Sequence, residues 1–158
     1  MIEESYQEHD INIDFPLIKI LNEHLKEGND YEITFCIILT NQRQWLYDKC
    51  PDDSNMWKEF SPSDGKIWRN VLKDWCETNN IKNIVLDLSI NGEVNLGVSD
   101  WENTAPLMVT LLNEHLVSKS GNLFNKHHNQ TIDKLLIQHS SGTPALCSAL
   151  YLWGIEKS

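Results

Sequence analysis

The stretch from Asp133 to Ile155 constrains the fold of this chain more than any other. It opens with the short apolar run 135–137, which predicts a strand covered on both faces. A polar turn follows, and an apolar helix begins at Pro144 with Thr143 as its expected N-cap. The backbone N–H groups and the positive dipole end of such a helix point out of the carboxyl edge of the sheet, where they favour an anion, most often a phosphate. The stretch therefore predicts an α/β sheet with an anion site beside its last helix.

The rest of the chain alternates between expected helices and expected strands. Strand 31–40, YEITFCIILT, is nearly continuously apolar from Ile33, which is typical of a central parallel strand. Helices are expected at 14–28, from Ser63 or Asp64 to Thr78, and from Thr104 as N-cap to His115, with a further strand at 84–90. This order predicts an α/β fold, a Rossmann-like three-layer sandwich with a mostly parallel central sheet. We expect an acidic extension and one helix at 1–29 and the domain itself at 30–158.

A β-hairpin is expected at 84–98, because the pair Asn91-Gly92 is a strong hairpin signal. A two-residue turn would place Leu88 opposite the polar Asn95. A loop of odd length pairs Leu88 with Leu96 and Ile90 with Val94 instead, so we predict that register.

Two longer segments carry no strong periodicity. Residues 43–62 form a connection of about 20 residues, far above the 2–6 that are usual in such folds. Their aromatic side chains either shield a ligand or stack on a base, or they anchor the segment to the domain or to a partner subunit; we favour the anchoring role. Residues 119–131 are polar and are expected to form a loop.

Charge and composition limit the function classes. The formal charge of −10 argues against binding long DNA or RNA through phosphate neutralisation, although backbone amides and hydroxyls can still hold a small nucleotide. The sequence has no apolar run of the roughly 20 residues that span a bilayer, and its acidic start is not a signal peptide. We therefore expect a cytoplasmic protein without membrane contact.

Neither histidines nor cysteines show metal-ligand spacing. The cysteines Cys36, Cys50, Cys76 and Cys147 are scattered, which indicates reduced thiols. The pair His127-His128 lies in a polar segment, where solvation is a better interpretation than metal binding. We expect no cofactor and no metal.

The candidate ligand site combines the ends of two predicted strands. If the first and the last strand are parallel and central, their carboxyl ends open onto one crevice. The crevice would offer hydroxyls, amides and helix-terminal N–H groups, which suit phosphates and nucleobase edges. The sequence contains neither a P-loop, nor GxGxxG, nor a GxSxG nucleophile elbow. The residues concerned are Thr40, Asn41 and Gln42 after the first strand, and Ser140, Ser141, Gly142, Thr143, Pro144 and Ala145 after the last.

These two motifs resemble those of CRISPR-associated Rossmann-fold (CARF) domains. The run from His139 to Ala145, followed by an apolar helix, is similar to their "GGTPAM"-type signature, and Leu39 to Gln42 resembles the other half of the pattern. The resemblance covers roughly residues 30–158. It implies a homodimeric sensor of type III CRISPR antiviral defence that binds a cyclic oligoadenylate, such as the tetra- or hexa-adenylate, across its two-fold axis. The same two groups of residues would then contact the ring.

The sequence departs from that family at three points. Ser141 replaces the first glycine of the signature, and Leu146 stands where methionine is common. Such sensors usually continue into an effector domain, whereas this sequence stops at Ser158. The resemblance therefore implies a stand-alone domain, an excised sensor, or a subunit whose effector is fused or separately encoded.

Two further functions stay open. One is a metal-independent ring nuclease, in which Ser140, Ser141, Thr143 and Gln42 would position the ring and Lys126 would assist. The other is a non-catalytic interaction domain that uses Tyr151 and Trp153 of the last helix. We favour the sensor because no residue stands out as a general base.

Overall fold

The computed structural model describes residues 13–49, 54–60, 64–91, 94, 96–138 and 143–158. The strands are β1 (Phe35–Asn41), β2 (Asn83–Ser89), β3 (Phe124–Asn125) and β4 (Gln130–Thr131). The α-helices are α2 (Pro16–Lys26), α3 (Arg43–Lys49), α4 (Asn55–Phe60), α5 (Arg69–Thr78), α6 (Trp101–Leu116) and α7 (Pro144–Lys157). Two short 3-10 helices, η2 (Gly65–Trp68) and η3 (Gly97–Ser99), lead into α5 and α6.

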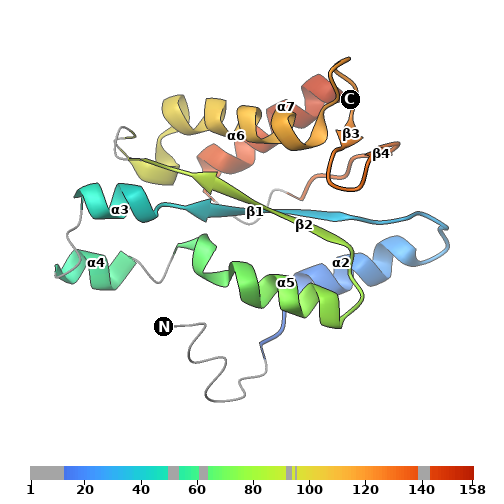
Figure 1. Cartoon of the computed structure of the whole chain (residues 1–158), viewed down its shortest axis with the longest axis horizontal. Coiled ribbons are helices and arrows are strands. Elements are labelled where there is room, and N and C mark those ends of the chain that lie inside the picture. Colours follow the sequence, from blue (N-terminus) through green and yellow to red (C-terminus); the bar gives the residue numbers. More distant parts are fainter. Residues whose placement is uncertain (1–12, 50–53, 61–63, 92–93, 95, 139–142) are drawn as a thin grey trace.

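The molecule has three layers, with α6 and α7 on one face of the β1–β2 sheet and α2 and α5 on the other (Figure 1). The larger core lies under α6 and α7, where Leu86 and Leu88 of β2 meet Leu112 and Trp153. The smaller core lies on the opposite face and joins Leu72 of α5 to Val85. Alternate β2 residues thus enter opposite cores, as the two-residue period of a strand requires. The mixed α/β class is confirmed.

β1 and β2 pair in parallel, with Asn41 opposite Ser89 at their carboxyl ends. The sequence predicts that β1 is a central strand, but β2 is its one hydrogen-bonded neighbour among the described residues. Every residue of β1 is therefore only half-buried, although both of its faces are covered. The parallel sheet has two strands here, smaller than the one expected.

The predicted closing strand 135–137 is wrong, since residues 134–138 form neither helix nor strand. Their apolar side chains are nevertheless used. Leu135 packs on the larger core, and a Cβ placed on Gly154 of α7 would come within 2.0 Å of Ile137 Cδ1. The apolar run thus identifies a segment that packs under α7 without hydrogen bonding as a strand.

The predicted β-hairpin at 84–98 is also wrong. Leu96 lies in a turn and is exposed, and residues 97–99 form η3 instead of a returning strand. Gly97 has a φ of +55°, which bends the chain out of an extended path. The indole Nε1 of Trp45 donates to the Val94 carbonyl at 2.6 Å. A side chain therefore bonds the carbonyl that a hairpin would have paired with the neighbouring strand.

The expected N-cap of α6, Thr104, lies four residues after the observed one. Asp100 is the N-cap, and its Oδ1 accepts from the Asn103 amide at 3.3 Å. Thr104 lies inside the helix, fully buried, and its hydroxyl donates to the Asp100 carbonyl at 2.5 Å. Aspartate and threonine are both good N-caps, so sequence alone did not decide between them.

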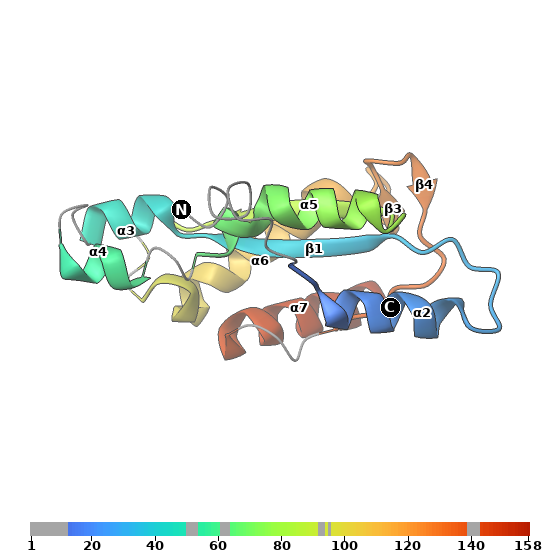
Figure 2. The same ribbon diagram turned by 90° about the horizontal axis from the view of Figure 1, so that it is seen from below.

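Both segments that were expected to be loops contain regular structure. Residues 43–62 include α3 and α4, whose Tyr47 and Trp57 rings stack with centroids 4.7 Å apart. Residues 119–131 contain the short antiparallel pair β3–β4. The two regions lie at opposite ends of the molecule (Figures 1 and 2).

The helix expected before the first strand is confirmed as α2, which packs on the smaller core through the adjacent Phe15 and its own Ile18. Phe15 meets Trp75 of α5 edge-on, with ring centroids 5.4 Å apart. Among the described residues, no helix has the length and apolar character that crossing a membrane needs.

Cys36 of β1 should be chemically inert in the folded protein. Burial raises the pKa of Cys36 in β1 to about 12 from an ordinary 9.0. At pH 8 its thiolate fraction is then roughly 1,000-fold lower than that of a free thiol, and the thiolate is the reactive form. We expect Cys36 to resist iodoacetamide for hours in buffer and to react within minutes in urea, as followed by peptide mass spectrometry. Equal alkylation under both conditions would contradict this burial.

Candidate functional site

The candidate site lies where the parallel strands β1 and β2 end, facing α3 (Figure 1). Asn41 is the last residue of β1, and its side-chain amide reaches Ser89 Oγ at the end of β2, 3.4 Å away. Its carbonyl accepts from the Ile90 amide at 2.8 Å, which extends the pairing by one residue. The two strand ends are therefore held side by side, as expected for a binding edge in a parallel sheet.

An open cleft of about 380 Å³ occupies this edge. Its described lining combines two cationic side chains, one phenol ring, and amide and hydroxyl groups: Asn41, Arg43, Gln44, Tyr47, Lys66, Ser89, Ile90 and Asn91. Arg43 and Lys66 place two positive charges here in a chain whose formal charge is −10. The cleft therefore suits an anion that carries an aromatic or hydrogen-bonding group.

The elements around β1 explain why these cations meet. α3 begins at Arg43, immediately after the strand, and η2 brings Lys66 back to the same edge. Gly65 permits the close approach: its amide donates to Thr40 Oγ1 at 3.3 Å, and a Cβ placed on it would lie 3.0 Å from Thr40 N. A larger residue at this position would push Lys66 away from the strand end.

Besides Asn41, which bonds to Ser89, the other two predicted residues at the end of β1 also have structural partners. The Thr40 hydroxyl holds η2 through the Gly65 amide, and the backbone N–H of Gln42 donates to Asp64 Oδ1 at 3.0 Å. The side-chain oxygen of Gln42 accepts from the Val98 amide at 3.3 Å. Of Thr40, Asn41 and Gln42, only Asn41 lines the cleft.

The predicted meeting of the two motifs is found at a single residue. The hydroxyl of Thr143 donates to the Val98 carbonyl at 3.0 Å, while the Val98 amide is held by Gln42. Thr143 is the N-cap of α7 by position, but its side chain makes no capping hydrogen bond. Pro144 and Ala145 form the first turn of α7, and Ser140, Ser141 and Gly142 lie outside the described residues.

Asp64 is a buried carboxylate beneath the cleft, with 4% of its surface exposed. Burial raises its pKa, while hydrogen bonds from the backbone amides of Gln42 and Lys66 and the charges of Arg43 and Lys66 act in the opposite direction. It therefore fastens η2 to the end of β1 rather than facing a ligand.

Replacing Asp64 tests that role. Asp64→Ala leaves two inward-facing amides without an acceptor and should lower the free energy of unfolding by about 1–3 kcal/mol. Asp64→Asn keeps one oxygen acceptor and buries no charge, so it should lose less. Urea unfolding of both variants measures the difference.

The pH dependence gives a second readout of Asp64. Because its folded pKa lies above the ordinary 3.8, the folded state holds this proton more tightly than the unfolded state. The contribution of Asp64 to stability therefore falls as the pH rises through the window above 3.8. Over that window the stability of the Asn variant should rise relative to that of the wild type. Equal losses of unfolding free energy in the Ala and Asn variants at all pH values would contradict this role of Asp64.

Sequence reasoning missed the two cations. Arg43 closely follows the predicted strand, and Lys66 falls in the first turn of the predicted helix. Both positions could therefore have indicated cations at the carboxyl edge of the sheet. The residue proposed to assist a ring nuclease, Lys126, is misplaced: its Nζ donates to the Glu114 carbonyl at 2.7 Å, at the end of α6. Among the described lining residues of the cleft, none is a histidine or a carboxylate.

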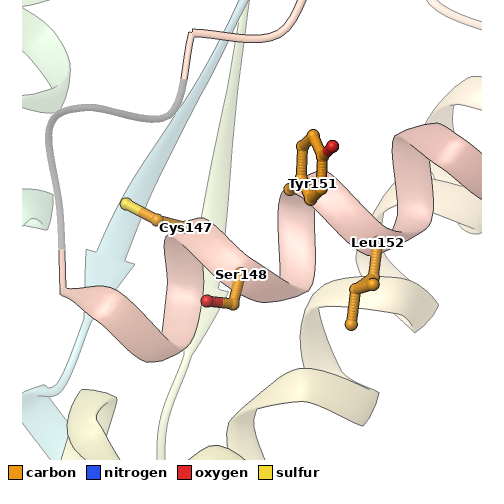
Figure 3. A pocket seen from close by; sticks show the side chains of 4 residues that line it. All are labelled: Cys147, Ser148, Tyr151 and Leu152. Carbon is orange, nitrogen blue, oxygen red and sulfur yellow. The ribbon is translucent and has the colours of Figure 1, made fainter.

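A second hollow, of about 290 Å³, lies on the outside of α7 and is lined by Cys147, Ser148, Tyr151 and Leu152 (Figure 3). It carries no charged side chain among these residues, so it lacks the cations that the cleft at the strand ends offers to a phosphate. Trp153, which we grouped with Tyr151 as an interaction surface, points into the larger core instead, with 2% of its surface exposed.

Comparisons of the chain with protein-family models, curated proteins and solved structures find no match. Within the part of the chain that the structure describes, no group of three or more His, Cys, Asp or Glu side chains could hold a metal ion.

Proposed function

We propose that this domain binds a phosphate-bearing nucleotide in the cleft at the carboxyl edge of β1 and β2. The observation that carries the proposal is the pairing of Arg43 and Lys66 at that edge, in an otherwise acidic chain. Charge-assisted hydrogen bonds from such groups to phosphate oxygens are about twice as strong as neutral ones. The amides of Asn41 and Asn91 are suited to the edges of a base, and Tyr47 offers an aromatic ring beside them.

We propose further that the nucleotide is a cyclic oligoadenylate and that the domain acts as a homodimeric sensor in type III CRISPR defence. The support for this ligand is the resemblance of Leu39–Gln42 and His139–Ala145 to CARF motifs. A ring carries one negative charge per nucleotide, so two copies of the Arg43–Lys66 pair around a two-fold axis would match four charges. A sensor accounts for the lining of the cleft better than a nuclease does, because its described groups include donors and cations but no general base.

Isothermal titration calorimetry tests the nucleotide, and light scattering after gel filtration tests the homodimer. Cyclic tri-, tetra- and hexa-adenylate should be compared with AMP and ATP under the same conditions. Tight binding of one ring size, with weak binding of AMP, supports the full proposal. Equal affinity for AMP or ATP and the rings would support nucleotide binding and reject the ring. A monomer at 100 μM with ligand present would reject the two-fold arrangement.

A further inference from the structure

A pair of histidines joins the β3–β4 hairpin to the end of α6, far from the candidate cleft. His115 Nδ1 and His127 Nε2 lie 2.9 Å apart. The ring centroids are 5.0 Å apart and the ring planes are inclined by 22°. The centroid distance nearly equals the N–N distance plus the two ring radii, about 1.1 Å each, so the rings meet head to head with their nitrogens pointing at each other.

This geometry fits a shared proton better than a shared metal ion. One neutral ring donates its N–H and the other accepts with its lone pair, along the line that joins them. Two imidazoles on one metal would direct their lone pairs to a common point at about 2.0–2.1 Å from each nitrogen, which bends the arrangement away from a line.

The hairpin has other attachments as well, since Leu123 and Ile132 at its two ends pack on the larger core. The Lys126 amide donates to the His115 carbonyl at 3.2 Å, and Lys126 Nζ caps the helix at Glu114 and Asn113. An isolated bridge joins Val117 to Leu123. Of these described contacts, the histidine pair is the one whose charge can change near neutral pH.

We propose that the His115–His127 pair is a proton-operated latch, which holds the β3–β4 hairpin on α6 while at least one ring is neutral and releases it when both rings are protonated. Two imidazolium rings are donors only, so no acceptor remains and two positive charges face each other at hydrogen-bond distance. Protonation of histidine clusters changes interfaces in this way in known pH sensors.

The surrounding charges favour release rather than a compensated pair. Lys126 and His128 on the hairpin add positive charge. Glu114, which precedes His115 on α6, carries a negative charge that acts in the opposite direction. Across the hairpin, Glu32 is held by Lys82 and Gln130, and on α7 Glu156 pairs with Lys157. Burial and the charges of His115 and His128 lower the pKa of His127 from 6.5. Because the folded pKa is lowered, the unfolded hairpin binds the proton more tightly, and the stability that the pair gives is lost as the pH falls below about 6.5.

Amide hydrogen exchange at Lys126, whose amide donates to the His115 carbonyl, tests the latch in the full chain. Between pH 7.5 and 5.0, protection relative to the intrinsic exchange rate should fall roughly fivefold, the equivalent of one hydrogen bond, while α5 keeps its protection. In His127→Gln the amide stands near the place of Nε2 and cannot become charged, so the protection should be independent of pH. His24→Gln, on the exposed face of α2, is the matched control and should behave as the wild type.

Three outcomes would overturn the latch: protection that does not change with pH in the wild type, the same fall with pH in His127→Gln, or a stoichiometric metal ion that EDTA removes together with the protection at neutral pH. Nucleotide binding at the cleft is a separate measurement. A latch without nucleotide binding, or binding without a latch, would therefore be distinguished.

Discussion

Replacing Trp153 by alanine should lower the free energy of unfolding by about 3–5 kcal/mol, a large part of the roughly 5–15 kcal/mol that a domain possesses. Trp153 is 2% exposed, lies between α7 and α6, and donates its Nε1 to Asn113 Oδ1 at 2.9 Å. The alanine variant removes the indole from the larger core and leaves the Asn113 side chain without this donor. Urea unfolding followed by far-UV circular dichroism measures the loss.

Two variants on α7 make the result specific. Tyr151 is 50% exposed on the same helix, so Tyr151→Ala should cost less than about 1 kcal/mol. Trp153→Phe keeps most of the volume but removes the hydrogen bond, and should fall between the wild type and the alanine variant. If Tyr151→Ala destabilised as much as Trp153→Ala, the assignment of the inner and outer faces of α7 would be wrong.

Neutralising the two cations of the cleft should have the largest effect on ligand binding. Arg43 and Lys66 are each expected to contribute one charge-assisted contact to phosphate, worth about 1.5–3 kcal/mol. Each single alanine variant should then weaken nucleotide binding by about tenfold or more, and the double variant by roughly 100-fold. Affinity of the double variant should also depend less on salt than that of the wild type, because screening acts on these charges.

A charge-matched control separates the site from the net charge of the chain. Lys19 on α2 and Lys73 on α5 are exposed and do not line the cleft. The variant Lys19→Ala with Lys73→Ala changes the net charge by the same two units and should bind as the wild type. Equal weakening in both double variants would show a general electrostatic effect instead of a site.

Local patterns predicted the elements of this chain better than their pairing. The 3.6-residue period places α2, α5 and α7, because helical spacing of apolar residues can be read from the local sequence whatever the neighbours are. Strand pairing depends on remote partners. The run 135–137 has the composition of a buried strand, yet it packs against α7 at Gly154 without forming a strand. Asn91-Gly92 is a good turn signal, but Gly97 and the Trp45 indole bend the following residues into η3.

Of the described residues that the sequence predicted as ligand contacts, Asn41 lines the cleft, and the cationic groups of the cleft come from residues that were not predicted. Thr40 to Gln42 and Thr143 were expected to converge, and Gln42 and Thr143 do meet at Val98. Their side chains are engaged in holding η2, η3 and α7 together, which a strand-end motif cannot reveal. The charges that line the cleft come from Arg43 and Lys66. Arg43 closely follows β1, and Lys66 reaches the same edge because Asp64 and Gly65 hold η2 against β1.

The central claim is tested most directly by titrating cyclic tri-, tetra- and hexa-adenylate into the wild type and into the Arg43→Ala, Lys66→Ala double variant by calorimetry. We expect saturable binding of at least one ring to the wild type and about 100-fold weaker binding to the double variant, with both proteins folded by circular dichroism. No heat of binding with any ring, or the same affinity in the wild type and the double variant, would contradict it.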